Sequence, residues 1–128
     1  MGHKETYEAI SQAVLSGDYE RIRGYVADEF VLSEPAPLPY GGEYRGPQGF
    51  VDLVYGIRKW YDVDVVKTEL TEAEGDLLVC EFVFGFTSRR TGERLEAACV
   101  DLFRFDDEGR FLRGDVYYED PAKLASIA

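Results

Sequence analysis

The second half of the chain consists of strand-like segments separated by short turns, and this pattern limits the fold more than any other feature. Three turns, each containing a glycine, divide residues 63–119 into segments with many β-branched and aromatic side chains. Short turns of this kind join antiparallel strands, and each strand points alternate residues to opposite faces. The pattern predicts a four-stranded antiparallel meander with strands over 63–73, 77–88, 94–105 and 110–119.

The first half of the chain predicts helices and one short strand. Apolar residues recur at helical spacing from residue 4, and Gly17 and Pro47 are residue types that end and begin helices. Helices followed by a meander indicate an α+β fold with the helices packed on one face of the sheet. The expected elements are helices over 4–16, 18–26 and 46–61, a strand over 30–34 and a proline-rich loop over 35–42.

Length and charge limit what kind of protein this is. The 128 residues fit one domain, spanning 1–128, and 45% of them are hydrophobic. A net charge of −11 disfavours nucleic acid and anionic membranes as partners, because both would be repelled. The sequence has no run of about 18 apolar residues, and its start lacks an apolar signal region. We therefore expect a cytoplasmic protein with no membrane span.

The two cysteines and the single histidine predict neither a disulfide nor a His-based metal site. Cys80 and Cys99 lie on neighbouring predicted strands, about four residue pairs out of register, which is roughly 13 Å along the strand. A disulfide needs Cα atoms within about 7 Å, so we expect two buried free thiols, as in a reducing compartment. Because His3 is the only histidine, we expect no His-based metal site.

One acidic residue, Asp101, falls within an aromatic stripe. Alternation places it on the same face as Cys99 and Phe103, and the neighbouring strands add further aromatic side chains to this face. A carboxyl group enclosed by aromatic rings either has hydrogen-bond partners for structural reasons or holds a proton as part of a chemical site. The residues that share this face are Phe82, Phe84, Phe86, Cys99, Asp101, Phe103, Gly114, Val116 and Tyr118.

The turn lengths predict how these strands pair. A two-residue turn in the second hairpin pairs Phe82 with Asp101, and a four-residue turn would shift the partners by two and keep the face. A two-residue turn in the third hairpin pairs Asp101 with Val116 and Cys99 with Tyr118. The opposite face mixes charged and apolar residues and is either solvated or a dimer interface. Its apolar members are Val83, Val100, Leu102 and Tyr117.

Several different short motifs follow one another along nearly the whole chain, in an order that matches a known family. They are Ser16-Gly17-Asp18, residues 25–30, Ser33-Glu34-Pro35, residues 41–47 and residues 100–110. In this order and spacing the chain resembles the nuclear transport factor 2-like superfamily, which includes SnoaL-like polyketide cyclases and ketosteroid isomerase. The resemblance implies a cystatin-like cone, in which a curved antiparallel sheet wraps around a pocket closed by three N-terminal helices.

The resemblance also implies roles for several residues. Asp101 falls where ketosteroid isomerase has a protonated aspartic acid that donates to an oxyanion, and Glu34 falls where that enzyme has its aspartate base. The family's catalytic tyrosine on the first helix is replaced by Ile10. Tyr7 and Tyr25 are the nearest tyrosines that could reach the pocket in its place.

The expected function is a cofactor-independent acid/base enzyme, of the isomerase, cyclase or lyase type, that acts on an apolar carbonyl compound. Glu34 would be the base, and Asp101, with Tyr7 or Tyr25, would stabilise the developing enolate oxygen. We expect the small apolar molecule to bind in a pocket lined by Trp60, Phe82, Phe84, Phe86, Cys99, Phe103, Val116 and Tyr118.

Two other functions are compatible with the sequence. The first is a module that binds a ligand or dimerises without catalysis, with the face of Val83, Val100, Leu102 and Tyr117 as a homodimer interface. The second is an epoxide hydrolase like the limonene enzyme, which needs an Asp-Arg-Asp arrangement. Alternation points Arg104 and Arg113 away from the pocket, which disfavours the epoxide hydrolase.

Overall fold

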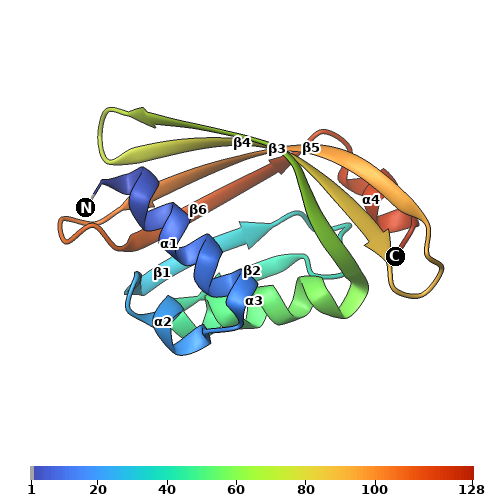
Figure 1. The fold of residues 1–128 in the computed structure, drawn as a ribbon, viewed down its shortest axis with the longest axis horizontal. Helices are drawn as coiled ribbons and strands as arrows, with labels where there is room; N and C mark the ends of the chain where they lie inside the picture. Colours follow the sequence, from blue (N-terminus) through green and yellow to red (C-terminus); the bar gives the residue numbers. More distant parts are fainter. Residues whose placement is uncertain (1) are drawn as a thin grey trace.

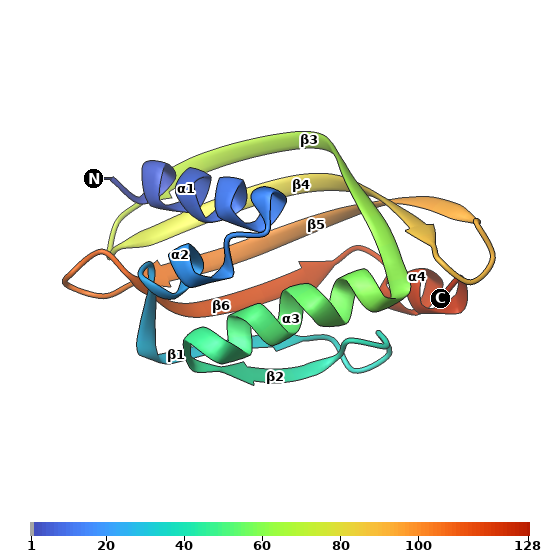
Figure 2. The ribbon, with the colours of Figure 1, turned by 60° about the horizontal axis from the view of Figure 1, so that its bottom comes forward.

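The computed structural model describes residues 2–128, and Figure 1 shows a curved sheet with helices packed against it. The view in Figure 2 shows that helices α1, α2 and α3 all lie on the same side of this sheet. The α+β fold expected from the sequence is confirmed. The elements are α1 (His3–Ser16), α2 (Tyr19–Arg23), β1 (Val26–Glu34), β2 (Gly42–Arg45), α3 (Gly46–Trp60), β3 (Tyr61–Ala73), β4 (Leu77–Ser88), β5 (Arg94–Phe105), β6 (Phe111–Tyr118) and α4 (Pro121–Ser126).

The sheet is larger than the predicted meander and is not wholly antiparallel. Its six strands follow the order β2-β1-β6-β5-β4-β3, and β3 to β6 form the expected meander. Strand β1 pairs with β6 in parallel, which corrects the expectation of a purely antiparallel sheet. A parallel pair needs a long connection, and here the rest of the meander separates the two strands. Local turn patterns therefore could not reveal this pairing.

The strand register confirms one predicted hairpin and corrects the other. Asp101 pairs with Val116 and Cys99 with Tyr118, as expected. In the β4–β5 hairpin, however, Phe82 pairs with Cys99 rather than with Asp101. The turn over residues 89–93 is longer than the two-residue turn first assumed, so the partners shift by two residues. An even shift keeps every side chain on its predicted face.

The register shift also brings the two cysteines closer than expected. Cys80 pairs directly with Asp101, so Cys80 and Cys99 are two residue pairs apart rather than four. Both side chains are buried, and both are free thiols.

Two boundaries near the first strand differ from the prediction. The second helix covers only Tyr19–Arg23, and β1 begins at Val26 rather than at residue 30. The side chain of Asp18 caps this helix by accepting a hydrogen bond from the backbone N–H of Arg21, at 3.2 Å. The five-residue helix is too short for apolar periodicity to mark its end.

The sequence analysis missed β2 and the C-terminal helix α4. Asp120 caps α4 by accepting from the backbone N–H of Lys123, and Pro121 occupies its first turn. Leu124 of this helix is fully buried, and its carbonyl oxygen accepts a hydrogen bond from the Tyr61 hydroxyl at 2.8 Å. Helix α4 therefore covers the end of the sheet where β3 begins.

Candidate functional site

A cavity of about 460 Å³ lies between the inner face of the sheet and helices α1 and α3. The strands contribute the predicted aromatic stripe, and the helices contribute aliphatic side chains such as Ile10 and Leu53. Most residues around the cavity are apolar, so any carboxyl group that faces it is poorly solvated. Of the residues predicted to form the pocket, those that line it are Phe82, Phe84, Phe86, Cys99, Phe103, Val116 and Tyr118.

Two predicted site residues lie elsewhere. Trp60 ends α3 outside the cavity lining, with the Lys59 ammonium 5.6 Å from its ring centroid. Tyr25 precedes β1, where its carbonyl oxygen accepts a hydrogen bond from the backbone N–H of Phe111 at 2.8 Å. Because α2 ends at Arg23, Tyr25 does not sit on a helical face that points inward, and it does not line the cavity.

Asp101 projects from β5 into the cavity wall. It is 9% exposed, and its Oδ1 accepts a hydrogen bond from the Cys99 thiol at 3.0 Å. Burial raises the pKa of Asp101 to about 7, and the thiol hydrogen bond partly offsets this rise. The side chain is thus a weak acid that changes its charge near neutral pH.

Glu34 reaches the same cavity from the end of β1. It is 7% exposed, and its Oε1 has no hydrogen-bond partner among residues 2–128. Burial and the charge of Asp101 raise the pKa of Glu34 to about 8, and a hydrogen bond from Tyr118 acts in the opposite direction. Strands β1 and β5 flank β6, and this arrangement brings the two acids to the same cavity although they lie far apart in the sequence.

Glu34 and Asp101, which we call the carboxyl pair, titrate as a unit because each charge raises the cost of the other. With pKa values of about 7 and about 8, the pair carries one proton in the interval between them.

A hydrogen-bonded pair of tyrosines adjoins Glu34. The hydroxyls of Tyr40 and Tyr118 lie 2.8 Å apart, and the Tyr44 hydroxyl donates to the carbonyl oxygen of Tyr40 at 2.7 Å. Tyr118 also lies close enough to Glu34 to lower its pKa, so the Tyr40–Tyr118 pair is next to Glu34. The sequence analysis missed Tyr40, which lies in the proline-rich loop; its only signal was an aromatic residue among turn residues.

Tyr7 lines the cavity beside the carboxyl pair. Its ring packs against Phe82 and Phe103, with centroid distances of 5.8 Å and 5.9 Å. Burial, together with the nearby cysteines and Asp101, raises the pKa of Tyr7 far above its ordinary range, so its hydroxyl stays protonated. Ile10 is buried against the cavity at the position where the resemblance places a catalytic tyrosine.

The cavity opens at a rim that the sequence analysis did not anticipate. Three apolar residues line the cavity and are also exposed: Leu15 by 72%, Val63 by 43% and Val65 by 60%. The rim also holds Arg58 and an ion pair, in which Arg89 Nη2 lies 2.6 Å from Asp62 Oδ1. These rim residues come from α1, the end of α3, the start of β3 and the β4–β5 turn.

The family of the chain follows from its sequence. A family model of the SnoaL-like domain matches residues 7–114. The chain belongs to the SnoaL-like domain family. No curated protein sequence matches it.

Solved structures show how widely this SnoaL-like fold is shared. An NTF2-like protein from Burkholderia xenovorans is 14% identical, with a TM-score of 0.88 over 98% of this chain and 95% of that one. IdmH, a putative polyketide cyclase from Streptomyces antibioticus, is 21% identical, with a TM-score of 0.72 over 98% and 97%. TerC, co-crystallised with polyporic acid, is 18% identical, with a TM-score of 0.81 over 98% and 96%. These likenesses show the fold of the nuclear transport factor 2-like superfamily.

Two further features of residues 2–128 bear on cofactors and membranes. In this part of the chain, no three histidine, cysteine, aspartate or glutamate residues gather where a metal ion could bind. No helix in the same range is long and apolar enough to cross a membrane.

The carboxyl pair makes the stability of the protein depend on pH. The folded protein keeps protons on Glu34 and Asp101 that the unfolded chain loses near pH 4, so the free energy of unfolding falls as the pH rises towards about 8. We expect a fall of about 2 kcal/mol or more between about pH 5 and pH 8 in urea unfolding experiments, because one pKa unit is worth about 1.4 kcal/mol.

Variants at the carboxyl pair test whether the pair causes this pH dependence of the free energy of unfolding. Glu34→Gln and Asp101→Asn should each make this pH dependence shallower, because the titrating group is removed. Glu69→Gln, at an exposed position on β3, should leave the slope unchanged. An equal slope in all four proteins would contradict the assignment.

Proposed function

We propose that the protein is a cofactor-independent acid/base enzyme that moves a proton next to a carbonyl group in an apolar, ring-containing small molecule. The observation that carries this proposal is the carboxyl pair, which shares one proton near neutral pH inside an apolar cavity. One ionised and one protonated carboxyl in the same site can accept a proton and donate a hydrogen bond in the same step.

The proposed step is an enolisation. The ionised carboxylate takes a proton from the carbon next to the carbonyl, while the protonated carboxyl donates a hydrogen bond to the carbonyl oxygen as negative charge develops there. Returning the proton to the same or another carbon completes exchange, isomerisation or ring closure, with no net oxidation. The resemblance to ketosteroid isomerase assigns Glu34 as the base and Asp101 as the donor, and we keep these roles in the proposal.

The relatives support this class of substrate. IdmH is described as a putative polyketide cyclase, and TerC was crystallised with polyporic acid. Both names fit ring-containing molecules with carbonyl groups, and we extend that chemistry to this chain as part of the proposal. Arg104 and Arg113 are exposed and do not line the cavity, so the Asp-Arg-Asp site of a limonene-type epoxide hydrolase has no support here.

Deuterium exchange tests the proposal without knowledge of the natural substrate. We expect the protein to accelerate exchange of the acidic C–H protons of β-tetralone in D₂O, followed by proton NMR. Glu34→Gln and Asp101→Asn should each slow this exchange by roughly 10²–10³-fold, while Glu69→Gln should not. The rate should peak between about pH 7 and pH 8, because only the singly protonated pair is active.

A different outcome would favour a binding module. If β-tetralone binds but exchanges at the rate seen in buffer, in the wild type as in the variants, the site does not catalyse enolisation. The fold would then serve to hold a ligand.

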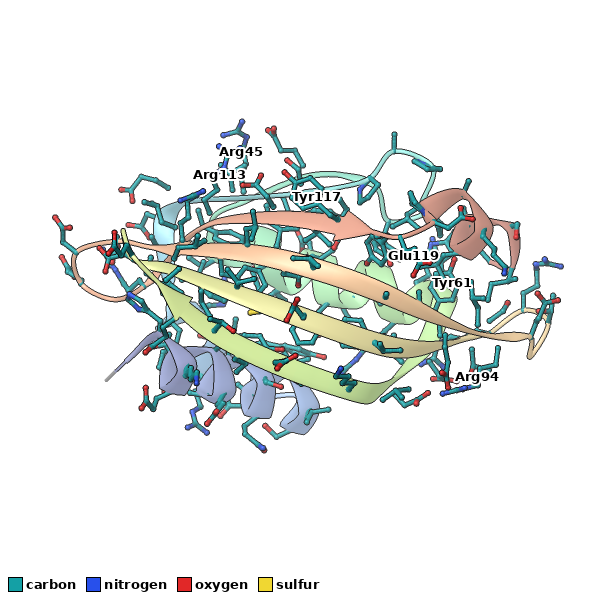
Figure 3. The ribbon with its side chains drawn as sticks, turned by 90° about the horizontal axis from the view of Figure 1, so that it is seen from above. Arg45, Tyr61, Arg94, Arg113, Tyr117 and Glu119 are labelled. Carbon is teal, nitrogen blue, oxygen red and sulfur yellow. The ribbon has the colours of Figure 1, made fainter. Side chains whose placement is uncertain are left out.

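We also propose that the protein is a homodimer, with the outer face of the sheet as its interface. Figure 3 shows this face, where Tyr117 and Arg113 lie along β6. Tyr117 is 60% exposed, and Val83, Val100 and Leu102 on the same face are half-buried. Charges of both signs, including Arg104 and Glu81, share this face, so two copies can approach with opposite charges paired.

Sedimentation velocity at micromolar concentration tests the interface. We expect a dimer for the wild type and a monomer for Tyr117→Asp, because the added carboxylate would be buried against an apolar patch. Tyr55→Asp, at an exposed position on α3, should remain dimeric. A monomeric wild type would contradict the proposal.

A cytoplasmic location is part of the proposed function. It is supported by the two buried free thiols, which a reducing compartment preserves.

A further inference from the structure

Arg58 is a cation at the cavity whose hydrogen-bond partners, among residues 2–128, are neutral. It lies near the end of α3, where its Nη1 donates to the Tyr19 hydroxyl at 2.7 Å and its Nη2 donates to the carbonyl oxygen of Val14 at 3.0 Å. Within residues 2–128, it makes no ion pair. These two bonds fix the guanidinium between α1, α2 and α3 and leave other N–H donors unused.

Among the described residues, the other arginines without an ion pair are Arg21, Arg90 and Arg104, and all three are exposed, whereas Arg58 is half-buried at the cavity. Acidic residues outnumber basic ones by 25 to 14, so a basic side chain has many carboxylates available. Arg89, the other arginine at the rim, pairs with Asp62. The arginines elsewhere that form ion pairs are Arg23, Arg45, Arg94, Arg110 and Arg113. Arg58 therefore keeps an uncompensated positive charge at the cavity.

The surroundings of Arg58 indicate which kind of ligand its positive charge could bind. The guanidinium is half-buried, and it shares the rim with the exposed apolar side chains of Leu15, Val63 and Val65. A molecule in this opening meets apolar surface and one positive charge together. A net charge of −11 repels anions in general, so an anionic ligand needs a local cation of this kind.

We propose that Arg58 is a specificity-determining residue that binds an anionic oxygen group, such as a carboxylate or sulfonate, on a ligand whose apolar rings fill the cavity. The planar guanidinium can present two parallel N–H donors to such a group. The inference rests on the proposed function only in using the same cavity. It narrows the substrate class from apolar carbonyl compounds to amphipathic ones that carry a negative charge at the rim.

Two dyes with the same rings, one of which carries a sulfonate group, test this inference. Anilinonaphthalene sulfonate carries a sulfonate, and N-phenylnaphthylamine has the same rings without it; both become fluorescent in an apolar cavity. We expect the wild type to bind the sulfonate more tightly than the neutral amine. Arg58→Gln should weaken sulfonate binding roughly tenfold and change amine binding less than twofold.

A matched variant controls for the general loss of positive charge. Lys59→Gln removes a neighbouring exposed cation outside the cavity lining and should leave both affinities unchanged. If Arg58→Gln weakens both dyes equally, or changes neither, Arg58 only ties the helices together and the inference is wrong. Failure of the wild type to bind either dye in the cavity, judged from NMR shifts of lining residues, would also overturn it.

A measurement on the wild type avoids any problem with folding of the variant. The Arg58 Nε–H resonance should shift when the sulfonate is added and should not shift with the neutral amine. No shift with the sulfonate would overturn the inference. The exchange experiment with β-tetralone is separate, so a protein that prefers the sulfonate but does not catalyse exchange would disprove the enzyme proposal alone.

Discussion

The cost of placing two carboxyl groups in one apolar cavity is the physical constraint on which the site depends. Within residues 2–128, neither Glu34 nor Asp101 forms an ion pair, and most of the side chains that line their cavity are aromatic or aliphatic. Burial therefore raises both pKa values, and the charge of Asp101 raises that of Glu34 further. A pair that shares one proton near neutral pH is the chemical result of this packing.

The fold supplies the two acids from strands on either side of β6. The parallel pairing of β1 with β6 brings the end of β1 to the cavity wall, and the β5–β6 hairpin brings Asp101 there. The Tyr40–Tyr118 pair then supports Glu34, and the Cys99 thiol supports Asp101. Each hydrogen bond favours the ionised form of its carboxyl, yet burial outweighs both.

The inner face of the meander could be predicted because strand parity is local. The β4–β5 hairpin follows the longer-turn alternative, two residues away from the two-residue register, and Asp101 points inward among Phe82, Cys99 and Phe103, since an even shift preserves the face. Contacts made through long connections could not be predicted. Three such contacts join segments that are far apart in the chain. They are the parallel pairing of β1 with β6, the hydrogen bond between Tyr40 and Tyr118, and the hydrogen bond from Arg58 to Val14. Helix α4 was missed because its six residues carry too short a pattern.

The most direct test of the account is a ¹³C NMR titration of the two carboxyl carbons. We predict midpoints of about 7 for Asp101 and about 8 for Glu34. In Asp101→Asn, the Glu34 midpoint should fall, because the charge that raises it is gone. Midpoints near 4 for both residues in the wild type, the ordinary range for solvated carboxyls, would contradict the claim that the cavity keeps a proton on the pair.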